Sequence, residues 1–121
     1  MSESRNQAPA DKLELYKRLL DLHPEIDLKG GLKLPYTSYQ GNMFSQLTKA
    51  GVLGLRLGLA ERAAFIAQFD CGLLETYGTV MKEYVAVPDQ LLEDSQRLLP
   101  YLEQSYAFAK TLKPQKRKRK Q

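Results

Sequence analysis

Residues 42–57 read NMFSQLTKAGVLGLRL, and this stretch decides the fold of the chain. Polar and apolar residues alternate over 42–48, and leucine occupies every second position from Leu53 to Leu57. Alternation with a period of two is typical of β-strands, whose side chains point to opposite faces in turn. The intervening Lys49-Ala50-Gly51 suits a short hairpin loop in which the glycine adopts a positive φ angle. The two strands are therefore expected to pair as antiparallel neighbours.

Upstream of this hairpin, the sequence predicts one helix and one strand. Asp11 and Glu14 have the spacing of a capping box, and apolar residues then recur at helical spacing, which predicts a helix over 11–22. Pro24 ends this helix, because the residue before a proline is pushed out of the helical region. The short, leucine-containing segment 30–34 predicts the first strand.

Downstream of the hairpin, helical and strand patterns alternate again. The alanine-rich segment 60–69 predicts a second helix that ends before Gly72. Segment 73–75 predicts a brief edge strand, and segment 81–87 predicts a stronger one. The stronger strand stops at Pro88, because proline cannot donate a hydrogen bond to a ladder.

The last predicted element is an amphipathic helix over 95–112. Pro100 lies either in its first turn or behind a separate turn that precedes a kink. The expected order is therefore α-β-β-β-α-β-β-α, an α+β fold of two layers in which an antiparallel β-sheet carries helices mainly on one face. We expect a disordered segment over 1–10, one folded domain over 11–114 and a basic tail over 115–121.

Bulk composition indicates one soluble domain. The chain has 121 residues, of which 43% are hydrophobic and 26% charged, as in ordinary globular proteins rather than disordered or membrane ones. No apolar run approaches the length of a membrane span, and the polar opening MSESRNQAPA lacks a signal-peptide region. The lone Cys71 cannot form an internal disulfide, which favours a reducing compartment, so we expect a cytoplasmic protein.

The basic character of the chain lies in its tail. Without the five consecutive cations near the C-terminus, the net charge of +4 becomes −1. A flexible cationic arm binds nucleic acid without sequence preference, so the tail is a candidate contact for nucleic acid or for an acidic protein. The alternative is a solvated extension that has no partner. The candidate binding residues are Lys116, Arg117, Lys118, Arg119 and Lys120.

A second candidate site is the segment Tyr36–Asn42, which we interpret as a loop between strands. Tyr36, Thr37, Ser38 and Tyr39 bring four hydroxyl groups together just before Gly41 and Asn42. Loops on a rigid sheet often carry binding residues. The alternative is that the Thr and Ser hydroxyls satisfy local backbone groups and the tyrosines lie over the core.

Lys82, Glu83 and Tyr84 are the third candidate group. Strand alternation places Lys82 and Tyr84 on one side and Glu83 on the other, towards an apolar face. Arg56 on the neighbouring part of the sheet is then in a position to form a structural ion pair with Glu83. The alternative is a carboxylate that binds a ligand.

Catalytic and metal-binding patterns are weak. His23 is the single histidine and precedes Pro24 at a helix end, which favours a capping role over a general base. One histidine and one distant cysteine do not make a zinc motif. We therefore assign no catalytic residue, no metal site and no cofactor.

Several short pieces, taken together and in order, resemble the N-terminal domain of the TfoX/Sxy family, in particular its short, single-domain bacterial members. The resemblance runs from Leu15 to Pro114. It is carried by Lys29-Gly30, Pro35 to Ser38, Gly41 to Ser45, Gly51 to Leu57, Tyr77 to Val85, Val87-Pro88, Ser105-Tyr106 and Leu112 to Pro114.

This resemblance implies a compact two-layer domain with an antiparallel sheet, often associated as a dimer. The best-known members of the family are regulators of bacterial competence with a second, helical domain, and relatives of the short form often have a histidine at the position of Asn42.

We therefore expect a non-enzymatic regulatory or interaction module, a homodimer whose tail contacts nucleic acid or an acidic protein. The alternative is a small-ligand-binding protein or hydrolytic enzyme that uses the Tyr36–Asn42 loop with Lys82 or Glu83.

Overall fold

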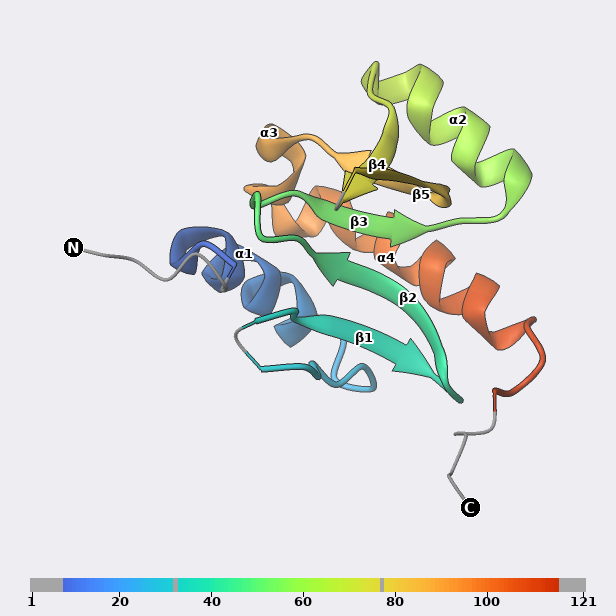
Figure 1. Cartoon of the computed structure of the whole chain (residues 1–121), viewed down its shortest axis with the longest axis horizontal. Coiled ribbons are helices and arrows are strands. Elements are labelled where there is room, and N and C mark those ends of the chain that lie inside the picture. The colour runs from blue at the N-terminus through green and yellow to red at the C-terminus, as the bar shows by residue number, and fades with distance from the viewer. Residues whose placement is uncertain (1–7, 32, 77, 116–121) are drawn as a thin grey trace.

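A computed structural model of the chain describes residues 8–31, 33–76 and 78–115. Helices and strands follow one another in the order expected for an α+β protein, with one additional short helix (Figure 1). The elements are α1 (Ala10–Asp21), β1 (Tyr36–Tyr39), β2 (Asn42–Leu47), β3 (Leu53–Arg56), α2 (Leu59–Phe69), β4 (Leu73–Thr76), β5 (Thr79–Val87), α3 (Asp89–Leu92) and α4 (Ser95–Lys110).

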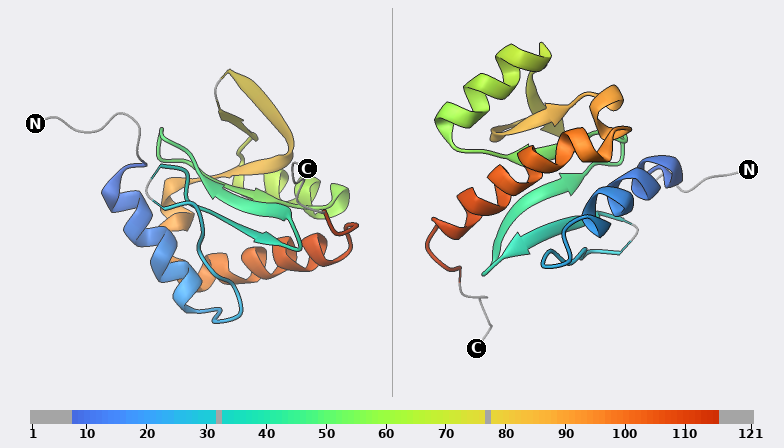
Figure 2. Two further views of the ribbon diagram at one scale, coloured as in Figure 1. Left: turned by 60° about the horizontal axis from the view of Figure 1, so that its bottom comes forward. Right: turned by 180° about the vertical axis from the view of Figure 1, so that it is seen from behind.

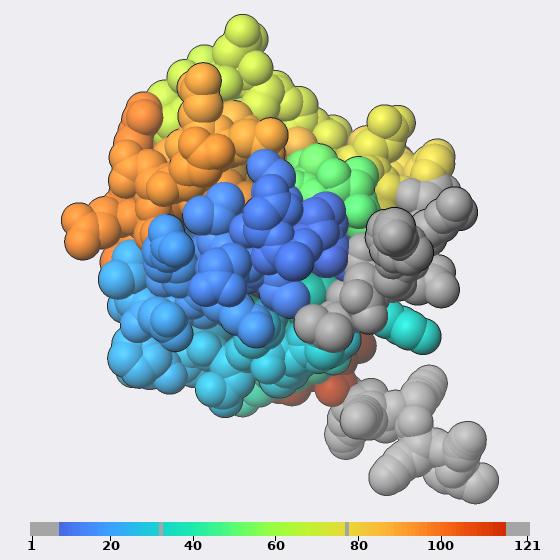
Figure 3. Space-filling model, turned by 90° about the vertical axis from the view of Figure 1, so that its left-hand side faces the viewer, coloured from blue at the N-terminus to red at the C-terminus, as the bar shows by residue number. Residues whose placement is uncertain are grey.

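The strands form an antiparallel sheet in the order β1-β2-β3-β5-β4. Helix α4 crosses one face of the sheet and contacts β1, β2 and β3, while α1 packs beside it against β2. Figure 2 shows both helices on the same side of the sheet, and Figure 3 shows α1 in blue between the orange α3 and the cyan segment that leads into β1. The expected two-layer α+β fold with helices on one face is confirmed.

The central hairpin forms as the sequence predicts. Strands β2 and β3 are antiparallel neighbours, with Ser45 opposite Leu55. The connecting turn closes through hydrogen bonds between Thr48 and Val52, and Gly51 adopts a φ of 89°. A side chain at Gly51 would be strained in this left-handed conformation. The leucines of the period-two pattern are fully buried under the helices.

The core lies between this sheet face and the helices. Helix α4 contributes a buried seam of Leu98, Leu102, Ser105 and Ala109. From α1, the buried side chains are Leu13, Tyr16, Leu19 and Leu20. Residues three and four apart lie on one side of a helix, so both helices present a continuous apolar stripe to the sheet.

A β-bulge in β2 determines which side chains leave the core. Thr37 lies opposite Ser45 but Ser38 lies opposite Met43, so Phe44 has no partner on β1. Both Phe44 and Ser45 are buried on the helical side, and Met43 therefore faces the other way. Ser105 Oγ of α4 lies 2.7 Å from the carbonyl oxygen of Phe44 and 2.7 Å from that of Arg56, so the two carbonyls share its single hydroxyl proton.

The prediction of a strand over 30–34 is wrong. Gly30 and Gly31 have φ angles of 83° and 62°, so the chain turns there instead of extending. Next to this segment, Lys29 forms an isolated antiparallel bridge with Tyr36. The strand begins six residues later, at Tyr36, because β-branched and aromatic residues fit a pleated, half-buried surface better than glycines do. The segment interpreted as a loop is therefore β1 followed by a tight turn at Gln40-Gly41.

The boundaries of the terminal helices also differ from the prediction. Pro9 takes the N-cap position of α1, and no side chain caps this helix end, so the capping box of Asp11 and Glu14 does not form. Helix α4 runs continuously from Ser95 through Pro100. Its N-cap is Asp94, whose carboxylate accepts a hydrogen bond from the backbone N–H of Arg97. A capped first turn and tertiary packing outweigh the loss of one hydrogen bond at the proline.

The folded part is longer than the predicted 11–114. Ala8 is buried in the core, and α1 begins at Ala10. At the other end, the backbone N–H of Gln115 donates to the carbonyl of Gln40 at 2.8 Å. Residues 1–7 and 116–121 lie outside the described residues. Within the described part of the chain, no helix is long and apolar enough to cross a membrane.

Candidate functional site

The sheet face opposite α1 and α4 carries the polar candidates. On this face, Ser38 and Met43 are cross-strand neighbours on β1 and β2, and Arg56 and Tyr84 are cross-strand neighbours on β3 and β5. We call it the open face, because α1 and α4 lie on the other side of the sheet (Figure 2).

The β4–β5 hairpin forms a wall at one end of the open face. Leu74 is fully buried, and it lies directly over Gly54: a Cβ added to this glycine would come within 2.5 Å of Leu74 Cδ2. The missing side chain therefore lets the hairpin fold over the sheet. The left view of Figure 2 shows the hairpin rising on the side away from α1 and α4.

Two adjoining hollows occupy the open face. One, of about 560 Å³, lies under the hairpin and is lined by Met43, Arg56, Val80, Met81, Lys82, Glu83 and Tyr84. The other, of about 640 Å³, lies over β1 and is lined by Lys29, Tyr36, Ser38, Gln40, Gly41, Met43 and Gln115. Met43 belongs to both, so we treat them as one trough across the sheet. Each volume is within the range of small-ligand pockets.

The carbonyl oxygen of Met43 is a shared hydrogen-bond acceptor in the middle of the trough. It accepts hydrogen bonds from Tyr84 Oη at 2.9 Å and from Arg56 Nη1 at 3.2 Å. Arg56 Nε also contacts Glu83 Oε1 at 2.8 Å, which confirms the predicted ion pair. Burial, as the largest cause, raises the pKa of Tyr84 to about 12, so its hydroxyl stays a hydrogen-bond donor at neutral pH.

Glu83 does not point to an apolar face. The Glu83 carbonyl accepts a hydrogen bond from Leu57 N–H at 3.0 Å, just beyond the end of β3. On the β4 side the register shifts between Leu73 and Leu74, so Glu83 lies in an irregular part of β5 where strict alternation of side chains does not hold. Its side chain is 45% exposed and lines the trough beside the exposed Lys82.

The other end of the trough is built around Lys29, which sequence reasoning missed. Its backbone pairs with Tyr36, and its Nζ donates to Ser38 Oγ at 2.9 Å. The Ser38 hydroxyl accepts this bond and keeps its own proton to donate. Two adjacent donors at an exposed position suit an anion. The available signal was the Lys29-Gly30-Gly31 turn, which folds Lys29 back onto β1.

The C-terminal segment is attached to the same end. Gln115 N–H donates to Gln40 O, and Asn42 Nδ2 donates to the carbonyl oxygen of Lys113 at 2.9 Å. These bonds hold the last described residues against the β1–β2 turn. The predicted tail residues Lys116 to Lys120 lie outside the described part of the chain, but the residue from which they extend lines the trough.

The structure separates the predicted binding residues into two groups. Tyr36 and Ser38 are half-buried in the trough, which is also lined by the exposed Lys82, the partly exposed Glu83 and the buried Tyr84. Thr37 is on the helical side instead, where its hydroxyl and that of Tyr16 both lie 2.5 Å from Ser45 Oγ. Asn42 is buried and holds the C-terminal segment. Thr37 and Asn42 are therefore structural residues.

His23 and Cys71 lie away from the trough lining. The His23 ring packs edge-to-face on Tyr106 with centroids 5.3 Å apart, which is a structural contact at the end of α1. Burial, followed by the nearby Asp70, raises the pKa of the Cys71 thiol, which disfavours the nucleophilic thiolate. Among the described residues, no three His, Cys, Asp or Glu side chains gather into a metal site.

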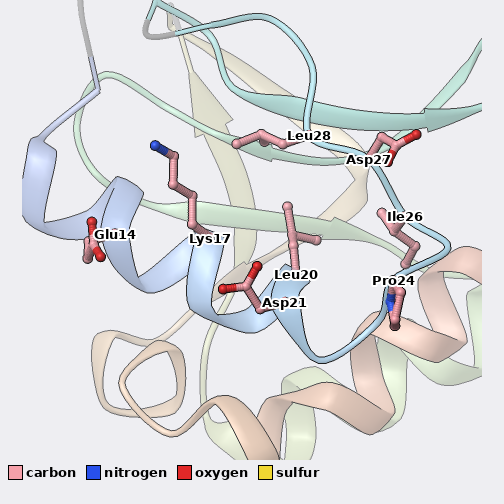
Figure 4. Close-up of a pocket in the computed structure, with 8 residues that line it drawn as sticks. All are labelled: Glu14, Lys17, Leu20, Asp21, Pro24, Ile26, Asp27 and Leu28. Carbon is pink, nitrogen blue, oxygen red and sulfur yellow. The ribbon is translucent and has the colours of Figure 1, made fainter.

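A separate groove of about 490 Å³ lies between α1 and the segment 24–28 (Figure 4). Its floor is apolar, with Leu20, Ile26 and Leu28, and its rim carries three carboxylates and Lys17. This groove is acidic at its rim, whereas the lining of the trough carries three cations against one carboxylate. The two hollows therefore differ in the sign of the charge that they attract.

Comparisons with protein-family models, curated proteins and solved structures found no significant match.

Proposed function

We propose that the chain is a non-enzymatic TfoX/Sxy-like regulatory domain that binds nucleic acid through its basic tail and the adjoining end of the trough. The family assignment rests on the ordered sequence pieces, and the α+β fold is compatible with it. The binding role rests on how the tail is attached.

The supporting observation is the hydrogen bond between Gln115 and Gln40, at the rim that also holds Lys29. Six further residues follow Gln115, and they reach at most about 20 Å when extended. Five of them are cations, so every tail cation is within this reach of Gln115. An arm held beside a cationic rim acts on the same polyanion at a high effective concentration.

Fluorescence anisotropy with labelled DNA and RNA tests this role. The full chain is compared with a form that ends at Gln115, at about 50 and 200 mM salt, where electrostatic binding weakens steeply. We expect binding by the full chain, and a loss of affinity and of salt dependence in the shortened form. Equal binding by both forms, or none by either, contradicts the proposed function.

We further propose a homodimer formed through the outer edge of β4. Within the described residues this edge has no strand neighbour, and Leu73 on β4 is 37% exposed. Unpaired edges readily add a strand from another chain. Sedimentation at several concentrations tests the dimer, and Leu73→Lys is expected to shift the protein to the monomer. A monomer at all concentrations contradicts it.

A second candidate function is the binding of a small anionic metabolite, favoured by the Lys29–Ser38 donor pair in the trough. A ligand at a hundred times its dissociation constant adds about 2.7 kcal/mol to the free energy of unfolding. A thermal-shift screen with carboxylates and phosphates would show this stabilisation, and Lys29→Ala would remove it. Failure of every anion to shift the melting temperature contradicts this candidate.

A further inference from the structure

We propose that the trough selects single-stranded over double-stranded nucleic acid, by taking base faces on its accessible apolar and aromatic side chains and phosphates on its cations. This inference rests on the proposed function and specifies its ligand.

Three cations are spread along the trough. Lys29 lies beside β1, and Lys82 lies on the hairpin at the opposite end. Arg56 lies between them, with its charge partly balanced by the contact with Glu83. Because the chain without the tail cations has a net charge of −1, this local excess of positive charge is a property of the open face and not of the whole surface. It is suited to a backbone that crosses the sheet.

Apolar side chains lie among these charges. Met43 joins the two hollows beside Arg56, and Met81 and the 45% exposed Val80 precede Lys82 on β5 and give the hairpin end an apolar surface. A duplex turns phosphates outwards and keeps the flat faces of its bases stacked inside, so it cannot use this surface. A single strand presents both groups at once. An acidic peptide would satisfy the cations but offers no flat faces to the apolar side chains.

Tyr36 provides a ring for stacking at the Lys29 end. A Cβ at Gly30 would lie 2.8 Å from Tyr36 Cδ1, so the ring rests directly on the glycine backbone. With a φ of 83°, Gly30 cannot readily be replaced, and the ring keeps this support. A half-buried ring supported from below loses little freedom when a base stacks on it.

The tail belongs to the proposed function and is not part of the trough. Gln115, the last described residue, lines the same hollow as Tyr36. The tail binds phosphates of either nucleic acid form, whereas the trough adds affinity for single strands alone. The two contributions are therefore separable by mutation.

The test uses the full chain and labelled oligonucleotides of about 12 nucleotides, as single strands and as the corresponding duplex. We expect the single strand to bind more tightly than the duplex. Met43→Glu and Tyr36→Leu each remove part of this preference, whereas Tyr36→Phe retains it. Loss of one stacked base is expected to weaken single-strand binding about 5-fold to 150-fold. The tail deletion weakens the binding of both forms.

Two controls make the outcome decisive. Lys82→Glu and Lys17→Glu change the charge equally, but Lys17 lies on α1, on the other side of the sheet. We expect Lys82→Glu alone to lower the salt slope for the single strand, by about 0.7 for one lost phosphate contact. A melting curve for each variant shows that it is folded.

Equal affinity for single strand and duplex overturns the inference, as does unchanged single-strand binding by folded Met43→Glu and Lys82→Glu. The proposed function stands if tail-dependent binding persists in those experiments. If labelled polyglutamate binds as tightly as the oligonucleotide, the ligand is an acidic protein and the inference fails. If the full chain binds no nucleic acid, the proposed function fails with it.

Discussion

The two faces of the sheet are built from the same alternating strands but differ in burial and in the bonds that their polar groups make. On the helical face, side chains are fully buried, and each hydroxyl near the centre has a partner, as in the Tyr16–Ser45–Thr37 chain. On the open face, Arg56 and Lys29 make specific bonds while remaining accessible. The comparison indicates that the helical face carries most of the stability, whereas the open face keeps polar groups accessible, so substitutions on the two faces should differ in kind.

The largest expected difference is between Leu55→Ala and Met43→Ala. Leu55 is completely buried under α4, so its truncation leaves a cavity and costs about 2–5 kcal/mol. Met43 lines the trough and is half-buried, so its truncation costs clearly less. Urea unfolding of both variants measures the difference. Equal losses would mean that the open face is packed as tightly as the core.

Serine substitutions sharpen the same contrast. Ser105→Ala leaves the buried carbonyls of Phe44 and Arg56 without this donor, which costs about 1–3 kcal/mol. Ser38→Ala removes one bond at an accessible position, and water replaces it. We therefore expect a change of less than about 0.5 kcal/mol for Ser38→Ala by the same urea measurement. A larger loss from Ser38→Ala than from Ser105→Ala would contradict the assignment of the faces.

A glycine pair tests the wall of the trough. Gly54→Ala places a methyl group against Leu74 and should cost about 1–3 kcal/mol by overpacking or by lifting the hairpin. Gly72→Ala is the matched control, because a Cβ there meets no atom within 4 Å. Thermal melting compares the two. If Gly54→Ala is tolerated as well as Gly72→Ala, the hairpin is not held down by Leu74.

The stability of the protein at alkaline pH tests the burial of Tyr16 and Tyr84. Burial raises the pKa of both Tyr16 and Tyr84 above the ordinary value near 10, and that of Tyr84 to about 12. The unfolded chain therefore loses these protons first, and the free energy of unfolding falls as the pH rises from about 10 towards 12. Tyr84→Phe should flatten this fall and cost about 1 kcal/mol at neutral pH through the lost bond to Met43.

Tyr16→Phe is the counterpart on the helical face and should flatten the same decline. An unchanged decline in both variants, measured by urea unfolding at several pH values, would show that neither tyrosine is protected from ionisation.

The smallest effect is expected for Glu83→Gln. The Arg56–Glu83 pair is 2.8 Å long but partly exposed, and such pairs contribute at most about 1 kcal/mol. Arg56 keeps its bond to the Met43 carbonyl in this variant, so the trough retains its shape. Removing the carboxylate should also strengthen the binding of an anionic probe. A large loss of stability would place Glu83 among the structural residues of the fold.

Much of the fold followed from local patterns. The period-two leucines of β3 predicted a strand, because a buried face requires every second residue to be apolar. Gly51 predicted the turn that connects this strand to β2, and together they predicted the central hairpin. The ion pair of Arg56 with Glu83 was also predictable from alternation and neighbouring positions. The first strand was misplaced, because Gly30 and Gly31 adopt left-handed angles and turn the chain, and the pairing of Lys29 with Tyr36 across this turn is not visible in the alternation pattern.

The candidate site was predictable in part. The sequence identified Tyr36, Ser38 and Lys82 as candidate binding residues, but nothing in their spacing showed that they line one trough. That depends on the strand order, which places β2 and β3 between β1 and β5, and on the bulge at Phe44, which turns Met43 towards the open face. Lys29 was missed because its bond to Ser38 forms only after the chain folds back.

The sequence by itself determined which side chains alternate along each strand, where the central hairpin turns and where the positive charge is concentrated, since these depend on residues close together in the chain. Tertiary structure alone decided that Thr37 enters the core, that Lys29 and Met43 line a common trough, and that Gln115 holds the origin of the tail beside it. These are contacts between distant residues, and their geometry is set by strand order, a bulge and the packing of α4, none of which a local pattern specifies.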